Sequence, residues 1–260
     1  MQPDELMDVA LDAATRAGDL LRERFERPPE GVTTKSSPTD LVSDADRDSE
    51  ALIKRLILER RPDDGLVTEE GDDLAAGSGI TWIVDPLDGT VNFLFGFPAW
   101  SVSIAARDVA GIAVGVVHDP NRGETFAAAR GRGAELNGAP VHVSGAADLS
   151  TALVATGFSY DAGARAVQAD ILRRVIPRVR DVRRMGSAAL DLCWVAAGRL
   201  DAYYEAPMET WDRAAGELIV AEADGVSSEL PAPLGLSPGV IAGNRSLHDD
   251  LRALVLDRPG

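Results

Sequence analysis

An apolar run that ends in two carboxylates three positions apart constrains this chain more than any other segment. Residues 82–93 read Trp-Ile-Val-Asp-Pro-Leu-Asp-Gly-Thr-Val-Asn-Phe, and the β-branched pair after the tryptophan favours a buried strand. Pro86 is predicted to end the strand ladder and to hold Asp85 in an extended conformation. Both carboxylates are therefore expected at the carboxyl end of a strand.

Oxygen ligands and amide groups converge directly after this strand. Asp88-Gly89 is a strong turn pair, and Thr90 can open a helical turn whose free N–H groups point toward an anion. Mg²⁺ prefers carboxylate, carbonyl, hydroxyl and water oxygens, and it often shares substrate phosphates. Asp85, Asp88, the Leu87 carbonyl and Thr90 supply three of these ligand types. The segment predicts a magnesium and phosphate site; the alternative is that the aspartates only shape a turn and cap a helix.

A second pair of acids precedes this strand. Glu69 and Glu70 follow the short apolar pair Leu66-Val67. A carboxylate there could meet Asp85 from a neighbouring strand. The alternative interpretation is a solvated acidic loop.

Two further acids lie at predicted helix starts. Asp46 lies at the beginning of an amphipathic helix, where a negative charge is favoured in any case. Asp212 opens another helical pattern and could serve only as its N-cap. For each acid, two interpretations are open: it stabilises the start of a helix, or it belongs to the predicted magnesium and phosphate site.

Together, these segments resemble the inositol monophosphatase family of Mg²⁺-dependent, lithium-sensitive phosphatases. The resemblance runs from about Lys35 to about Asn244 and rests on motifs that occur in the family's order. They are Lys35-Ser36-Ser37-Pro38-Thr39-Asp40-Leu41-Val42, Glu69-Glu70, Asp85 to Phe93, Gly186-Ser187-Ala188-Ala189, and Asp201-Ala202-Tyr203-Tyr204-Glu205 with Trp211-Asp212. The first and last of these favour the bacterial inositol-1-phosphatase branch.

The resemblance implies a role for each matching residue. Ligands of a first Mg²⁺ would be Glu69, Asp85, the Leu87 carbonyl and Thr90; ligands of a second would be Asp85, Asp88 and Asp212; Glu69 would help to hold a third. The catalytic residues would be Asp46, Glu69 and Thr90, with Asp46 and Thr90 orienting and deprotonating the attacking water. Substrate contacts would come from Asp88, Gly89, Thr90, Gly186, Ser187, Ala188, Glu205 and Asp212.

Two departures from the family pattern lie near these residues. Thr68 stands where the family usually has Gly, and residues 157–160 read Gly-Phe-Ser-Tyr in place of a more Ser-rich loop. The metal assignments do not depend on either position. The second departure bears on the contacts to a polyol.

The chemistry expected of such a site is hydrolysis without a covalent enzyme intermediate. Two metal ions about 3.5–4 Å apart would neutralise the ester, activate the attacking water and stabilise the leaving oxygen. His118, His142 and His248 lie far from the acidic motifs in sequence, and Cys193 lies in an apolar helical run that indicates a core residue. No nucleophilic His or Cys is therefore expected.

Length and composition favour a cytoplasmic globular protein. A chain of 260 residues with 45% hydrophobic residues can form one large domain or two subdomains. One cysteine excludes an internal disulfide, and the acidic residues 1–8 do not resemble a signal region. No apolar run approaches roughly 18 residues, so no membrane helix is expected. The net charge of −16 disfavours binding to nucleic acids or anionic membranes.

One basic segment runs against this charge balance. Six arginines lie within twelve residues: Arg173, Arg174, Arg178, Arg180, Arg183 and Arg184. We favour a solvated helix face with salt bridges to the acidic surface. Subunit contacts rank second, since the family is usually homodimeric and arginine is enriched at interfaces. Binding to RNA or a transcription complex, a role of some bacterial relatives, ranks third.

Hydrophobic periodicity predicts two helices, then an antiparallel β half, then an alternating half. Helices are predicted over 5–26, 44–60, 164–175, 187–197, 211–223 and 246–256. Strands are predicted over 80–84, 101–106, 112–117 and 125–129, beside Asn137-Gly138, and over 153–156, 201–204, 226–228 and 240–242. The expected fold is α+β / α/β, a layered αβαβα sandwich of the inositol monophosphatase / fructose-1,6-bisphosphatase type. A single domain over 1–260 would combine an α+β metal-binding half (1–147) with an α/β half (148–260) that supplies Asp212 and substrate contacts.

The predicted function is Mg²⁺-dependent hydrolysis of a small phosphorylated polyol, with inositol 1-phosphate as the favoured substrate. Hydrolysis of fructose 1,6-bisphosphate, histidinol phosphate or 3′-phosphoadenosine 5′-phosphate is the alternative within the same fold. A regulatory protein that binds RNA or a transcription complex is the alternative from another class. Glu205 favours a hydroxyl-rich substrate, because a nucleotide would require a stacking surface or cationic groups.

Overall fold

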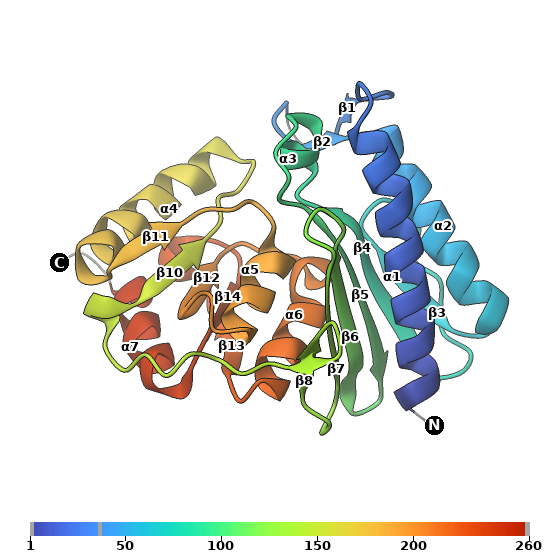
Figure 1. Ribbon diagram of the computed structural model, residues 1–260. Helices are drawn as coiled ribbons and strands as arrows, with labels where there is room; N and C mark the ends of the chain where they lie inside the picture. Colours follow the sequence, from blue (N-terminus) through green and yellow to red (C-terminus); the bar gives the residue numbers. More distant parts are fainter. Residues whose placement is uncertain (1–2, 36–37, 258–260) are drawn as a thin grey trace.

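The computed structural model describes residues 3–35 and 38–257. Within these residues, helices and sheets stack in five alternating layers (Figure 1). Two helices, a large sheet, two helices, a smaller sheet and two helices follow one another from the N-terminal side to the C-terminal side. This arrangement confirms the predicted αβαβα sandwich.

The N-terminal outer layer holds α1 (Pro3–Phe25) and α2 (Asp44–Arg60). The large sheet contains, in spatial order, β3 (Gly65–Thr68), β4 (Thr81–Asp88), β5 (Ser101–Asp108), β6 (Gly111–Asp119), β7 (Glu124–Ala129), β8 (Ala134–Leu136) and β9 (Ala139–Pro140). The middle layer holds α5 (Ala188–Ala196) and α6 (Thr210–Glu222). The smaller sheet has the order β11 (Asp181–Arg183), β10 (Leu153–Thr156), β12 (Ala202–Glu205), β14 (Gly239–Gly243) and β13 (Val226–Leu230), and α4 (Ala162–Val175) and α7 (Arg245–Leu256) cover its far face.

Each junction between layers has its own hydrophobic core. Trp82 and Val84 of β4 pack in the core formed with α1 and α2, whereas Ile83 packs in the core formed with α5 and α6. Because successive strand residues point to opposite faces, helices on both sides bury β4 from Trp82 to Asp88. Tyr204 and Leu251 belong to the third core, between the smaller sheet and the outer helices.

The strand β4 is longer than predicted. It continues through Pro86 to Asp88, and its pairing with β5 shifts register between Asp85, opposite Ser103, and Asp88, opposite Ser101. The prediction that Pro86 ends the ladder is therefore wrong. One extra residue on β4 forms a bulge, and a bulge is one of the few places where a sheet accepts proline.

The remaining elements agree with the predicted order. The helix over 44–60 and the strand over 153–156 have the predicted bounds, and the other predicted helices and strands differ at their ends. Among the described residues, β1 (Thr33–Thr34), β2 (Leu41–Val42) and β11 were not predicted, and β3 was suggested only as a strand next to Asp85. The large sheet is antiparallel except that β3 runs parallel to β4. In the described residues, no helix combines the length and apolar composition that a membrane crossing requires.

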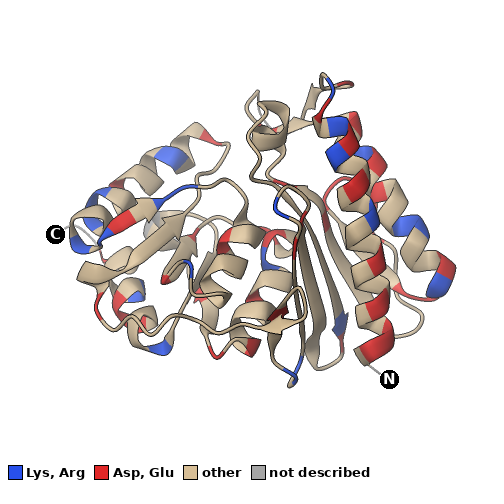
Figure 2. Ribbon diagram, in the orientation of Figure 1, with Lys and Arg blue, Asp and Glu red and all other residues tan. Residues whose placement is uncertain are grey.

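The basic segment is not one helix face, so that prediction is wrong. It runs from the last turn of α4 through a 3₁₀ turn into β11, and Figure 2 shows these basic residues on the side away from α1 and α2. Arg174 donates to the Val255 carbonyl at 3.1 Å, and Arg180 donates to the Thr151 carbonyl at 2.7 Å. Arg174 and Arg180 therefore hold neighbouring backbone segments in place through hydrogen bonds.

Candidate active site

A cavity of about 390 Å³ lies where β4 ends and where α5 and α6 begin. Eight of the residues predicted for the site line it: Glu69, Asp88, Gly89, Gly186, Ser187, Ala188, Glu205 and Asp212. Four others, Asp46, Asp85, Leu87 and Thr90, are not part of the lining. Leu87 and Thr90 adjoin the lining residues Asp88 and Gly89 in the chain, and Asp46 is hydrogen-bonded to Thr90.

Asp46 and Thr90 form a buried pair. Asp46 is the third residue of α2, and its Oδ2 accepts hydrogen bonds from the backbone N–H of Ser43 at 2.8 Å and from the Ser43 hydroxyl at 2.6 Å. This capping box leaves Oδ1 facing the Thr90 hydroxyl at 2.8 Å. The same hydroxyl lies 3.1 Å from the Leu87 carbonyl. Since one hydroxyl carries one proton, it donates to one of these two oxygens at a time.

Asp88 is held at the beginning of α5. Its carboxylate accepts hydrogen bonds from the Ser187 hydroxyl at 2.5 Å and from the backbone N–H groups of Ala188 and Ala189 at 3.2 and 2.9 Å. The Ser101 hydroxyl lies 3.4 Å from Asp88 Oδ2. Positive N–H groups at a helix start stabilise a negative charge. The end of β4 is thereby fixed against a helix that lies about 100 residues later in the chain.

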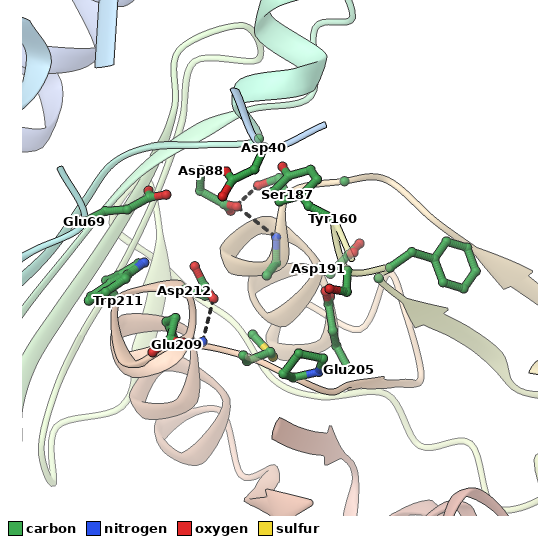
Figure 3. A pocket seen from close by; sticks show the side chains of 18 of the residues that line it. Asp40, Glu69, Asp88, Tyr160, Ser187, Asp191, Glu205, Glu209, Trp211 and Asp212 are labelled. Atoms are coloured by element: carbon green, nitrogen blue, oxygen red, sulfur yellow. Dashed lines mark hydrogen bonds between the residues drawn. The ribbon is translucent and has the colours of Figure 1, made fainter. Parts of the chain in front are cut away.

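Asp212 enters the cavity from the start of α6. Glu209 is the N-cap of this helix, and Asp212, its third residue, accepts a hydrogen bond from the Glu209 backbone N–H at 2.9 Å. The alternative that Asp212 is itself the N-cap is therefore wrong. Figure 3 shows the side chains of Glu69, Asp88 and Asp212 turned toward the same space.

These carboxylates concentrate negative charge where little water reaches. Burial raises the pKa of Asp85 well above its usual range, and the nearby charges of Glu69 and Asp88 raise it further. Burial likewise raises the pKa of Asp212, with a contribution from Asp88, and raises the pKa of Asp88 to about 6. Each shift means that the folded protein holds the ionised group less easily than water does.

Lys35 offsets part of this charge. Its Nζ lies 2.7 Å from Glu69 Oε1 and also contacts the Glu70 carboxylate. Lys35 begins the first family motif, and it is not among the predicted site residues. Ser36 and Ser37 of the same motif lie outside the described residues.

The donor set fits a hard divalent cation. Carboxylate, carbonyl and hydroxyl oxygens are present, and the buried negative charge exceeds what Lys35 can offset. Within the described part of the chain, no three acidic, histidine or cysteine side chains enclose a metal ion by themselves. Mg²⁺ usually retains water and shares phosphate oxygens, so it does not need a cage made by protein alone.

The other wall of the cavity is built around Glu205, at the end of β12. Tyr203 donates its hydroxyl to Glu205 Oε2 at 2.5 Å, and burial raises the pKa of Glu205 to about 7. A Cβ atom at Gly157 would overlap the Glu205 carboxylate, so the absence of a side chain there lets the two segments meet. The loop that departs from the family pattern thus lies against this wall.

Six charged residues of the lining are not among the predicted site residues: Lys35, Asp40, Asp161, Arg184, Asp191 and Glu209. Arg184 belongs to the basic segment, and Asp191 lies in the apolar helical run that contains Cys193. The available signal for Asp191 was an acidic residue inside the otherwise apolar run from Ala188 to Ala197. For Arg184 the signal was its place two residues before Gly186.

Comparison with known proteins gives a consistent result. A model of the inositol monophosphatase family matches residues 2–258. The inositol-1-monophosphatase SuhB of Mycobacterium tuberculosis (strain ATCC 25618 / H37Rv) is 43% identical over 98% of this chain and 94% of its own length. The Nus factor SuhB of Escherichia coli (strain K12) is 39% identical over 92% of this chain and 91% of its own. The crystal structure of extragenic suppressor protein suhB from Bartonella henselae superposes with a TM-score of 0.90 at 36% identity, covering 96% of this chain and 98% of that one.

Proposed function

The chain belongs to the inositol monophosphatase family, and we propose that it hydrolyses inositol 1-phosphate to inositol and phosphate in a Mg²⁺-dependent reaction. One observation carries this proposal: carboxylates from β4, α6 and the loop after β3, buried at Asp88 and half-buried at Glu69 and Asp212, line one cavity, and the pKa values of Asp85, Asp88 and Asp212 are raised. Such a cavity is suited to a cation and, through the cation, to a phosphate ester.

The proposed ligands are those that the resemblance to the family implies. Two to three Mg²⁺ ions would be held by Glu69, Asp85, the Leu87 carbonyl, Asp88, Thr90 and Asp212. Bound Mg²⁺ supplies the positive charge that offsets the charge of the phosphate ester and of the carboxylates. The raised pKa values support this assignment, because a nearby cation favours the ionised form of each carboxyl group.

The chain's own residues have three proposed tasks. Thr90 accepts a hydrogen bond from the attacking water while its own proton points to Asp46, and this pair orients the water and takes up its proton. The N–H groups of Gly89 and Thr90, at the start of α3 (Thr90–Leu94), hold a phosphate oxygen. The start of α5 and Glu205 bind the leaving alcohol on the opposite side of the phosphate.

Phosphate release tests the proposal directly. Inositol 1-phosphate, fructose 1,6-bisphosphate, histidinol phosphate and 3′-phosphoadenosine 5′-phosphate are compared at several Mg²⁺ concentrations. Asp88→Asn should lower turnover by at least about 100-fold, because a metal site supplies several kcal/mol. Asp170→Asn, on the exposed surface of α4, is the matched control. Preference for another ester would correct the substrate, and turnover that ignores both Mg²⁺ and Asp88→Asn would refute the site.

A second role has one observation in its favour, namely the E. coli relative that is called a Nus factor. If the basic segment binds RNA or a transcription complex, its exposed residues should carry that binding. Arg173→Ala with Arg183→Ala is a suitable variant, because both side chains are exposed and neither lines the cavity. Loss of RNA binding with retained hydrolysis would support this role, and unchanged binding would exclude this surface.

Several finer properties stay predictions. The homodimer, the cytoplasmic location and inhibition by lithium follow from the resemblance and the composition. The division of the domain at residues 147 and 148 also stays a prediction. Sedimentation analysis and phosphate release with added lithium are the corresponding measurements.

A further inference from the structure

Asp191 is a buried acid in the cavity wall to which the proposed mechanism gives no task. Its side chain is 1% exposed, and its Oδ1 has no hydrogen-bond partner. Figure 3 shows it beside Glu205, away from Glu69 and Asp212. An unpartnered buried carboxylate oxygen is costly, so this position requires an explanation.

The contrast with Asp88 shows how unusual this environment is. Asp88 accepts hydrogen bonds from three groups at the start of α5, whereas Asp191, one turn further along the same helix, has none at Oδ1. Burial raises the pKa of Asp191 well above its usual range; the negative charge of Glu205 raises it further, and Arg184 acts in the opposite direction. The protein itself therefore leaves this acceptor unsatisfied.

Helix geometry sets the distance between the two ends of the cavity. Ser187, which donates to Asp88, is the N-cap of α5, and Asp191 lies four residues later on the same face. Four residues of a helix span about 6 Å. If the phosphate binds at the Asp88 end, the alcohol part of the ester extends along α5 toward Asp191.

We propose that Asp191 is a specificity-determining residue that accepts a hydrogen bond from a hydroxyl group of the leaving alcohol. This inference rests on the proposed phosphatase function and adds a residue to it. Glu205 already receives the Tyr203 hydroxyl on one oxygen, so the neighbouring Asp191 widens the acceptor surface of this wall. Alcohols with a hydroxyl group remote from the ester oxygen are favoured, and leaving groups without hydroxyl groups gain nothing from Asp191.

The test compares two esters and two substitutions. Inositol 1-phosphate carries hydroxyl groups around its ring, whereas 4-nitrophenyl phosphate carries none. Asp191→Leu, which suits the apolar surroundings of α5, should lower kcat/KM for inositol 1-phosphate by about 10- to 100-fold and leave that for 4-nitrophenyl phosphate within about threefold. Asp191→Asn retains one acceptor oxygen and should restore part of the loss. Asp170→Asn is again the surface control.

The outcomes separate this inference from the function on which it rests. If the unchanged chain hydrolyses neither ester with Mg²⁺, the proposed function fails and the inference falls with it. If the unchanged chain is active but Asp191→Leu changes kcat/KM equally for both esters, or for neither, Asp191 does not contact the leaving alcohol and the inference is overturned. If the leucine variant does not fold, the asparagine variant decides: an equal loss on both esters overturns the inference, and a selective loss supports it.

Discussion

Without a divalent cation, the protein should lose stability as the pH rises from 5 to 8. Asp88 has its pKa raised from 3.8 to about 6, chiefly by burial. A carboxyl group with a raised pKa in the folded state binds its proton more tightly when folded, so its ionisation favours unfolding. The loss begins near the unfolded pKa and is complete above the folded one. At about 1.4 kcal/mol per pH unit, Asp88 alone accounts for about 3 kcal/mol over its whole titration, and about 1.4 kcal/mol of this is lost above pH 5.

Other groups in the cavity act in the same direction and extend the pH range. Glu205 has its pKa raised from 4.5 to about 7, so its contribution continues to about pH 8. The raised pKa values of Asp85 and Asp212 have the same sign. Thermal melting in EDTA at pH 5, 6, 7 and 8 measures the sum. A loss of about 3 kcal/mol corresponds to roughly 6–12 °C in a domain of this size.

Three controls identify the source of this pH dependence. Mg²⁺ at about 100 times its Kd should add about 2.7 kcal/mol at pH 8. Asp212→Asn removes one buried charge but keeps an oxygen for the Glu209 N–H, so in EDTA at pH 8 it should melt at a higher temperature than the unchanged chain. Melting in about 0.5 M salt screens the exposed charges but not the buried ones. A melting temperature that is flat or rises from pH 5 to 8 would refute the reasoning.

Substitutions at three further positions test single features of the structure. Thr90→Val should lower kcat for phosphate release by about 10²- to 10⁴-fold, whereas Thr90→Ser keeps the hydroxyl; equal activity of the two would contradict the role of the hydroxyl. Gly89→Ala should destabilise the fold by about 1–3 kcal/mol in thermal melts, because φ is +96° and the new Cβ would lie 3.0 Å from the Ala99 carbonyl; an unchanged melting temperature would show that the turn relaxes. Trp82→Phe removes the indole donor to Asp64 and should lower stability by about 1 kcal/mol with unchanged kcat; a fall in kcat would link this contact to the site.

The sequence contains most of the information that places the elements, because their signals are local. The helix over 44–60 has the predicted bounds, since Ser43 and Asp46 form a capping box directly before the apolar face. The fold class follows from the same local patterns. Glu69, Asp88 and Asp212, which line the cavity, lie in short motifs, and the resemblance of these motifs to those of the family is the reason that they could be named from the sequence.

What the sequence did not predict depends on contacts between distant segments. Pro86 is an interior strand residue because the pairing of β4 with β5 includes a bulge, and no local signal reports that pairing. The basic segment enters β11 because β10 offers an edge on which it can pair. Asp191 looks like an ordinary helix residue until β12 brings Glu205 beside it.

The capping boxes of α2 and α6 have an evolutionary consequence. Asp46 and Asp212 each use one carboxylate oxygen as a backbone acceptor at a helix start. An asparagine at either position retains such an oxygen but loses the charge. Hydrolysis can therefore disappear in one mutational step while the helices, sheets and outer surface persist. Proteins with this fold can therefore lose catalytic activity and acquire a binding role while every intermediate variant still folds.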